Sequence, residues 1–339
     1  MTDHRQSRNV RHAGLRRRLC AALLGLPLLA GAAAATAQSK SYPSRPVHLI
    51  VPVPPGGPSD LAARALADGM GKALGQPLVL ENRPGASGML GTSQALRAAP
   101  DGYTLFLSLP SGQITSPLLM ESPPFDGVRD FTPIGQFVRF TSVLLVHESV
   151  PVLDFGQLVQ YVRQHPGALN YGSTGVGSNP HLTTELVKLQ TGMDIMHVPY
   201  KGGAAMVQAL VANEIQVLFG EVNTALPWIQ SGQVRPLAVL SEARSPLLPD
   251  VPSLVEARVL DAAADFWMGL AGPPGLPQEI VARLHEAMTQ AVQGPEMQRF
   301  FAATGSEAAL GTPEALAALW AAEHDRASEV IRTKQIKAE

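Results

Sequence analysis

The chain has 339 residues, of which 45% are hydrophobic and 16% charged, and its formal net charge is −2. This length accommodates two domains of ordinary size, and the composition is typical of a globular protein with substantial cores rather than a disordered one. The charge balance lacks the basic excess that nucleic-acid-binding proteins need, so we expect no nucleic-acid partner.

The first forty residues have the pattern of a secretory signal peptide. Six arginines and one acidic residue, Asp3, precede an apolar stretch over residues 19–35 that contains Pro and Gly, and Ala35-Thr36-Ala37 fits a small-x-small cleavage site. The stretch is short for a membrane span of ~20 residues. We therefore expect residues 1–37 to be removed after about Ala37, leaving an exported protein with no stable membrane anchor. Arg16-Arg17-Arg18 leaves the twin-arginine export route open as an alternative to the general one.

Removal of the signal peptide would change the charge and the cysteine content. The remaining chain would carry 20 basic and 27 acidic residues, a net charge of about −7, and it would lose its single cysteine, Cys20. An exported protein without disulfides must be held together by its hydrophobic cores, which a two-domain chain of this size can supply.

After residue 41, short apolar runs alternate with helical patterns. This alternation is the signature of βαβ units on a parallel sheet. The apolar runs are residues 47–53, 78–80 and 104–108, and the helical patterns are 59–74 and 88–99.

The helix expected over 59–74 has clear signals at both ends. Ser59 is a candidate N-cap and Gly75 is placed to end the helix. The spacing of the apolar residues puts four of them on one face. These four are Ala62, Leu66, Met70 and Leu74.

Two extended segments, 134–139 and 143–147, are placed to carry the chain out of the first domain into a second α/β unit. Asp154 is expected to cap the first helix of that unit, which His165-Pro166-Gly167 would stop. The remaining pattern predicts strands at 169–171, 196–198, 217–219 and 237–240, and helices at 179–190, 203–212 and 224–230.

An apolar run at 266–271 precedes helical patterns at 278–293, 295–303 and 313–334, the last with Thr312 as cap and Pro313 at its first position. We expect no further strand among these helices, so the C-terminal part should return to cover the first domain. The chain would then cross between domains twice, near residues 140 and 264, which makes a hinge. The expected lobes are residues 42–140 with 264–339, and residues 141–263.

Four glycine-rich loops join a strand to a helix N-terminus. A helix N-terminus presents unpaired N–H groups and the positive end of the helix dipole, so it suits an anion. Any one loop taken alone is better explained as a tight connection. Four of them at consecutive strand ends favour a binding crevice at the carboxyl edges of the sheets. The loops span residues 54–60, 85–88, 171–178 and 199–203.

The motifs of common enzymes are missing. Gly85-x-x-Gly88-x-x-Gly91 is not the G-x-G-x-x-G fingerprint of dinucleotide-binding sites. No G-x-S-x-G elbow surrounds Ser173 or Ser178, so a serine hydrolase is disfavoured. We expect the protein to have no catalytic activity and no cofactor.

No metal site is predicted. His181 and Glu185 form an i, i+4 pair without a third ligand, which is more typical of a helix face than of zinc binding. Trp228, Trp267 and Trp320 lie in apolar periodic segments and are expected to pack in cores rather than to line a ligand cleft.

Several motifs together identify a family. Tyr42-Pro-Ser-Arg-Pro46 and Glu81-Asn-Arg-Pro-Gly85 resemble motifs of the extracytoplasmic solute receptors of the tripartite tricarboxylate transporter family, also called Bug receptors. The resemblance extends over essentially everything after residue 41. Further similar segments are residues 52–60, 99–104, 130–135, 171–175, 198–203 and 248–252.

The resemblance implies an α/β, two-lobed fold of the periplasmic-binding-protein type (type II, Venus flytrap), with two sheets and a hinge. It implies a monomeric periplasmic receptor that captures a small carboxylate-bearing metabolite between its lobes and delivers it to the membrane subunits of a tripartite tricarboxylate-type transporter. A periplasmic ligand sensor that signals to a histidine kinase or regulator needs the same trap, so the sequence does not separate the two functions.

The expected ligand site combines the glycine-rich loops with neighbouring strand ends. In similar receptors Phe-Asp-Asn often follows the strand that here ends in Phe219-Gly220-Glu221, so a carboxylate partner for a ligand ammonium is replaced by Gly220. We therefore expect a mono- or dicarboxylic acid without an α-amino group, unless Glu221 turns inward. The expected ligand-binding residues are Pro55, Gly56, Gly57, Ser59, Asp60, Ala86, Ser87, Gly88, Ser108, Ser173, Thr174, Gly175, Gly177, Ser178, His181, Tyr200, Lys201, Gly202, Gly203, Gly220 and Glu221.

Overall fold

The structure, a computed structural model, describes residues 42–337. The expected signal peptide and its cleavage site lie outside the described residues, so that expectation stays a prediction. Across residues 42–337, no helix combines the length and the apolar character that a membrane crossing requires.

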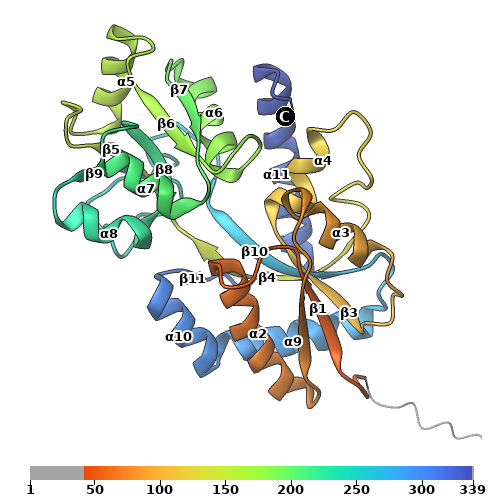
Figure 1. Cartoon of the computed structure of the whole chain (residues 1–339). Coiled ribbons are helices and arrows are strands. Elements are labelled where there is room, and N and C mark those ends of the chain that lie inside the picture. Colours follow the sequence, from red (N-terminus) through yellow and green to blue (C-terminus); the bar gives the residue numbers. More distant parts are fainter. Residues whose placement is uncertain (1–41, 338–339) are drawn as a thin grey trace, which may run out of the picture. The chain divides into compact units, whose positions relative to one another are not determined.

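The first sheet has six strands in the order β11-β4-β10-β3-β1-β2 (Figure 1). β1 pairs in parallel with β2 and β3, whereas β10 is antiparallel to both β3 and β4. The sheet is therefore mixed, where the sequence had predicted only parallel βαβ units. The strands are β1 (Val47–Val51), β2 (Leu78–Asn82), β3 (Thr104–Ser108), β4 (Thr132–Phe140), β10 (Phe266–Gly272) and β11 (Glu307–Ala308).

β11 contradicts the expectation that no strand lies among the C-terminal helices. Glu307 and Ala308 pair with Arg139 and Val138 of β4. Two residues are too few to show a strand periodicity in the sequence, so only the pairing with β4 reveals this strand.

Helices cover this first sheet, and α9 and α10 pack against α2 (Figure 1). The predicted apolar face of α2 is buried, and Gly75 ends the helix with φ +70°, as expected. The predicted cap is wrong: the N-cap is Gly57, because Pro58, preset for a first helical position, begins the helix and leaves Ser59 inside it. The helices are α2 (Pro58–Leu74), η1 (Ala86–Gly88), α3 (Met89–Leu96), η2 (Pro110–Thr115), α4 (Ser116–Leu118), α9 (Gln278–Gln293), α10 (Pro295–Thr304) and α11 (Pro313–Lys334).

The second sheet has the order β7-β6-β8-β5-β9, with β6 parallel to β7 and β8, and β5 antiparallel to β8 and β9. Its first helix is capped as predicted, because the Asp154 carboxylate accepts a hydrogen bond from the backbone N of Gln157. The elements are β5 (Ser142–His147), α5 (Phe155–Gln164), β6 (Asn170–Ser173), α6 (Asn179–Thr191), β7 (Met196–Pro199), α7 (Gly203–Val211), β8 (Val217–Glu221), α8 (Val222–Gln230) and β9 (Val234–Val239).

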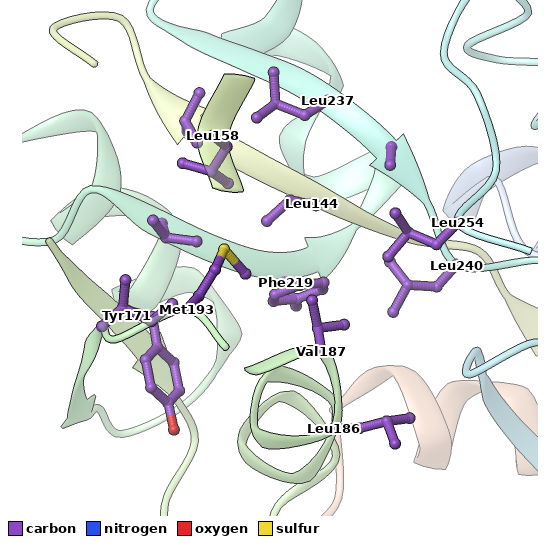
Figure 2. Close-up of a cluster of buried hydrophobic side chains, with 14 of the residues drawn as sticks. Leu144, Leu158, Tyr171, Leu186, Val187, Met193, Phe219, Leu237, Leu240 and Leu254 are labelled. Carbon is purple, nitrogen blue, oxygen red and sulfur yellow. The ribbon is translucent and has the colours of Figure 1, made fainter. Parts of the chain in front are cut away.

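Both faces of the second sheet are buried, which explains why its strands read as continuous apolar runs. Leu144 and Phe219 belong to one core cluster, shown in Figure 2. Their strand neighbours Val143 and Leu218 belong to a cluster on the other face. Tyr171 lies in the first cluster with its hydroxyl oxygen directed away from Leu144, Leu158 and Leu237 (Figure 2).

The C-terminal helix α11 contributes to two cores. Leu316 and Trp320 are buried in the cluster that also contains Trp267, so the core positions predicted for these two tryptophans are confirmed. Ala327 and Val330 instead pack in the cluster of the second sheet. The expectation that the C-terminal part covers only the first domain is therefore too simple.

A polar cluster joins the two places where the chain passes between the sheets. Asp265, just before β10, accepts a hydrogen bond from the backbone N of Ser142 at 2.9 Å. Arg139 of β4 lies 3.7 Å from the same carboxylate and pairs with Glu307 of β11 at 2.9 Å. These passages fall beside residues 140 and 264, which supports the lobe boundaries that we propose.

Candidate ligand-binding site

The loop before α2 is held by the buried carboxylate of Asp60. One oxygen accepts hydrogen bonds from the Gly56 backbone N at 2.9 Å and from Arg64 Nε at 2.8 Å, and the other accepts from Asn82 Nδ2 at 2.8 Å. Burial raises the pKa of Asp60, but the hydrogen bonds from Arg64, Gly56 and Asn82 outweigh it and hold the pKa below its ordinary value. Asp60 is thus engaged in shaping the loop.

Because Asp60 fixes the loop, the backbone of the two glycines faces open space. A Cβ atom added at Gly56 or Gly57 would meet nothing within 4 Å, and Pro55 is exposed beside them. The sequence placed Asp60 in the site as a ligand contact, whereas its geometry favours a positioning role. Arg64 and Asn82 were missed, although Asn82 lies within the Glu81-Asn-Arg-Pro-Gly85 motif.

Replacing Asp60 by alanine is expected to lower the free energy of unfolding by about 2 to 3 kcal/mol, because a charged acceptor with several hydrogen bonds is lost. Urea unfolding measures the change. Asp68→Ala is the matched control, since Asp68 is exposed on the same helix. An Asp60 variant no less stable than this control would contradict the positioning role.

The second loop has strained backbone. Gly85, Ala86, Ser87 and Gly88 all have positive φ, at +130°, +47°, +55° and +100°. Residues other than glycine rarely adopt such angles, so the strain lies at Ala86 and Ser87, and strain of this kind gathers at functional sites. Ala86 and Ser87 are exposed, whereas Gly88 is buried, and a Cβ atom there would lie 3.3 Å from the Pro52 carbonyl oxygen.

Ser108, at the end of β3, does not face solvent. Its hydroxyl is fully buried, donates to Gln113 Oε1 at 2.6 Å and accepts from Trp320 Nε1 at 3.1 Å. A buried hydroxyl that already donates one hydrogen bond and accepts another is poorly suited to contact a ligand. This geometry therefore argues against the expected contact between Ser108 and the ligand.

The hydroxyls of the loop after β6 do not converge on one volume. Ser173 Oγ donates to the Gly175 carbonyl and accepts from the Gly175 N at 3.0 Å. Ser178 Oγ donates to the same carbonyl at 2.7 Å. Thr174 is the exposed hydroxyl of this loop, and a Cβ atom at Gly175 would meet nothing within 4 Å.

Gly177 faces protein. Its carbonyl accepts a hydrogen bond from Thr115 Oγ1 at 3.2 Å, and its N donates to His181 Nδ1 at 3.1 Å. A Cβ atom there would come within 2.4 Å of Leu119 Cδ1. Gly177 and His181 therefore support the loop from behind. His197, which packs on His181 with ring centroids 4.3 Å apart, was missed, because a histidine in a short strand carries no distinguishing pattern.

The loop after β7 supplies a cation and open backbone. Tyr200 N donates to the Ser173 carbonyl at 2.8 Å, which ties this loop to the preceding one. Burial raises the pKa of Tyr200, as does Glu214. Lys201, Gly202 and Gly203 are exposed, and within residues 42–337 Lys201 makes no ion pair.

Gly220 and Glu221 end β8. Glu221 pairs with Ser142 through its backbone, and its side chain is half-buried. Among the described residues its carboxyl group has no hydrogen-bond or ion-pair partner, and burial raises its pKa. Because side chains alternate along a strand, Glu221 projects to the face that buries Phe219, and Gly220 to the other.

Parallel strands bring these loops together. β6, β7 and β8 run in the same direction, so Ser173, Pro199 and Glu221 end at one edge of the second sheet. β1, β2 and β3 do the same in the first sheet. Two hollows of about 480 and 500 Å³ lie elsewhere, lined around residues 117–130 and around 154–163, and neither includes a glycine-rich loop of the predicted site.

Two sheets joined by two passages, with open glycine-rich loops at the carboxyl ends of parallel strands, define a two-lobed periplasmic binding protein. Residues 62–336 match the family described as the tripartite tricarboxylate transporter family receptor, and the chain belongs to that family. The resemblance found in the sequence is therefore confirmed.

Named relatives are similar over nearly their whole length. Protein BugT of Bordetella pertussis is 33% identical over 92% of this chain and 96% of its own. A structure of an R. palustris protein with adipate is 33% identical, covers 87% of this chain and 99% of its own, and has a TM-score of 0.72. The structure of MatC from Rhodopseudomonas palustris with bound malate is 30% identical, covers 86% of this chain and 100% of its own, and has a TM-score of 0.70.

Proposed function

We propose that this protein is a periplasmic receptor that binds a small carboxylate between the loops of its two lobes and delivers it to a tripartite tricarboxylate-type transporter. The observation that carries the proposal is the open space beside Gly57, Gly175 and Gly203, where the backbone N–H groups of Gly57 and Gly203, at the starts of α2 and α7, have no hydrogen-bond partner among the described residues. Backbone N–H groups at helix N-termini stabilise a carboxylate without needing a full cation. Two similar proteins bind adipate and malate.

Affinity at the level of a receptor requires enclosure. Binding a ligand of about ten heavy atoms at ~1 μM requires a binding free energy of about −8 kcal/mol. Divided by the number of heavy atoms, this free energy is well above the average per atom for larger ligands. Hydrogen bonds to a charged group contribute more where water is excluded. A ligand covered by loops from both lobes would meet that condition.

Titration calorimetry with linear dicarboxylates of four to six carbons tests the proposal. We expect at least one of them to bind with a Kd in the micromolar range or below. Neutral sugars and simple amines of matched size serve as the comparison. Binding of a sugar or amine with no binding of any carboxylate would contradict the proposed function.

Matched pairs of acids test the ligand class. We expect succinate to bind more tightly than aspartate, because Gly220 offers no charged partner and a buried ammonium without one is costly. A charge-assisted hydrogen bond is worth about 1.5 to 3 kcal/mol, which corresponds to a preference of roughly tenfold or more. Tighter binding of aspartate that is lost in Glu221→Gln would show instead that Glu221 turns inward to meet the ammonium.

The remaining parts of the proposal concern export and chemistry. N-terminal sequencing of the exported protein should find Gln38 as the first residue. Finding residues 1–18 on the mature chain would contradict the proposed receptor function.

The bound acid should be recovered with unchanged mass after prolonged incubation, since a receptor does not transform its ligand. A converted product would favour an enzyme.

A further inference from the structure

A polar stack of three rings, two of them buried, lies behind the loop over residues 173–178 of the second lobe. The rings of Tyr171 and His197 stack with centroids 5.0 Å apart, and the His197 and His181 rings follow at 4.3 Å. Tyr171 is fully buried and His181 nearly so. These residues come from β6, β7 and α6, the three elements that carry the loops after Ser173 and Pro199.

The base of the stack is fixed by charge. Glu185 Oε1 accepts a hydrogen bond from the Tyr171 hydroxyl at 2.7 Å and from Lys188 Nζ at 2.6 Å. Lys188 also lies 5.3 Å over the Tyr171 ring, and Lys334 is 3.9 Å from the other oxygen of Glu185. These two ion pairs and the hydrogen bond from the Tyr171 hydroxyl anchor this part of the stack.

At the other end, each imidazole contacts the loop through a different ring nitrogen. His181 Nδ1 accepts a hydrogen bond from the Gly177 backbone N at 3.1 Å. His197 Nε2 lies 2.5 Å from Ser173 Oγ, and this hydroxyl in turn accepts from the Gly175 N at 3.0 Å. Gly175 and Gly177 have φ of +117° and +76°, a backbone conformation that glycine adopts readily and other residues rarely.

We propose that His181 and His197 are positioning residues that hold the loop over residues 173–178 in its ligand-binding conformation, His181 through Nδ1 and His197 through Nε2. The proposal rests on the proposed function for the meaning of the loop, but the two contacts exist without a ligand. Neither imidazole need touch the ligand.

The role requires a neutral His181. A nitrogen that accepts an N–H cannot itself carry a proton, so His181 must be the tautomer protonated at Nε2. Burial, with the neighbouring His197, lowers its pKa to about 4, against the opposing effect of Glu185 and with a further lowering by Lys188. The Gly177 contact is thus fully present above the ordinary histidine pKa of about 6.5, and it is lost as pH falls through about 4.

Replacing each histidine by asparagine or by glutamine distinguishes a contact made through Nδ1 from one made through Nε2. The side-chain oxygen of asparagine, an acceptor, lies close to the place of Nδ1, and the side-chain NH2 group of glutamine, a donor, can lie close to the place of Nε2. His181→Asn should therefore keep the Gly177 contact and His181→Gln should lose it. At residue 197 the order reverses, so that His197→Gln keeps the contact to Ser173 and His197→Asn loses it.

Amide hydrogen exchange and chemical shifts of Gly175 and Gly177, measured by NMR on the mature protein without ligand, test the inference. We expect exchange at Gly177 to rise at least tenfold in His181→Gln but not in His181→Asn, and exchange at Gly175 to rise in His197→Asn but not in His197→Gln. The ¹⁵N shifts of wild-type His181 should show Nδ1 unprotonated at pH 7. Urea unfolding of all four variants separates this effect from global stability.

Equal exchange in the two variants at each residue, or an Nδ1 that carries the proton, would overturn the inference. Binding of adipate and malate to the same variants is the second readout. Affinity should fall only in His181→Gln and His197→Asn, the two variants that lose their contact with the loop. If the wild-type protein binds neither acid, the proposed function is in question, whereas the exchange pattern still decides whether the histidines hold the loop.

Discussion

The free energy of unfolding is expected to fall by up to about 4 kcal/mol between pH 4 and pH 8 because of a single buried carboxyl group, Asp265. Burial raises its pKa to about 7, although the Ser142 N–H and Arg139 act in the opposite direction. The folded protein therefore retains a proton that the unfolded chain releases near pH 4. This stabilising contribution is complete below pH 4 and is lost as pH rises through about 7.

Asp265→Asn is expected to remove this pH dependence, because the amide stays neutral and its oxygen can still accept from Ser142. Urea unfolding of wild type and variant between pH 4 and pH 8 measures the difference. Asp261→Asn is the control, since Asp261 is exposed just before the same passage. Parallel stability curves for wild type and Asp265→Asn would show that the carboxyl group titrates normally.

The position of Asp265 gives this result a consequence for the hinge. Asp265 Oδ2 and Arg139 Nε are buried without hydrogen-bond partners among the described residues, 3.7 Å apart. The hydrogen-bonding capacity of these two atoms is therefore not fully used in this conformation. We expect this pair to change more than the rest of the protein when the passages near residues 140 and 264 bend.

Gly175→Val is expected to abolish carboxylate binding, with a loss of affinity of at least a hundredfold. Gly175 has φ +117°, a conformation that a β-branched residue avoids, and its missing Cβ points into open space where the ligand is proposed to lie. Both effects act on the same loop. Titration calorimetry with the tightest acid of the wild-type panel measures the loss.

A second glycine controls for backbone strain. Gly192 ends α6 with φ +71°, and a Cβ atom there would also meet nothing within 4 Å. Gly192→Val should destabilise the fold while leaving affinity within about twofold. A folded Gly175→Val protein that binds like the wild type would place the ligand elsewhere.

The secondary structure could be predicted almost completely because its signals are local. Asp154 and Thr312 cap their helices as expected, and strand β3 has the predicted bounds, since each depends on residues close in sequence. The pairing of strands does not depend on such local signals. The antiparallel placement of β10 and the existence of β11 depend on partners more than a hundred residues away, which a periodicity does not encode.

The candidate site could be predicted at the level of loops but not of side chains. Glycines mark the loops because the backbone there needs positive φ or close approach, as at Gly175 and Gly88. The direction of a hydroxyl or imidazole depends on neighbours from other strands. Ser108 and His181 turn inward for that reason, and His197 emerges only when β7 is placed beside β6.

Mass spectrometry of the small molecule released from the natively purified protein tests the proposed function most directly. We expect the wild-type protein to carry a compound with at least one carboxyl group and Gly175→Val, purified in the same way, to carry none. A released compound without a carboxyl group, or the same compound retained by folded Gly175→Val, would contradict it.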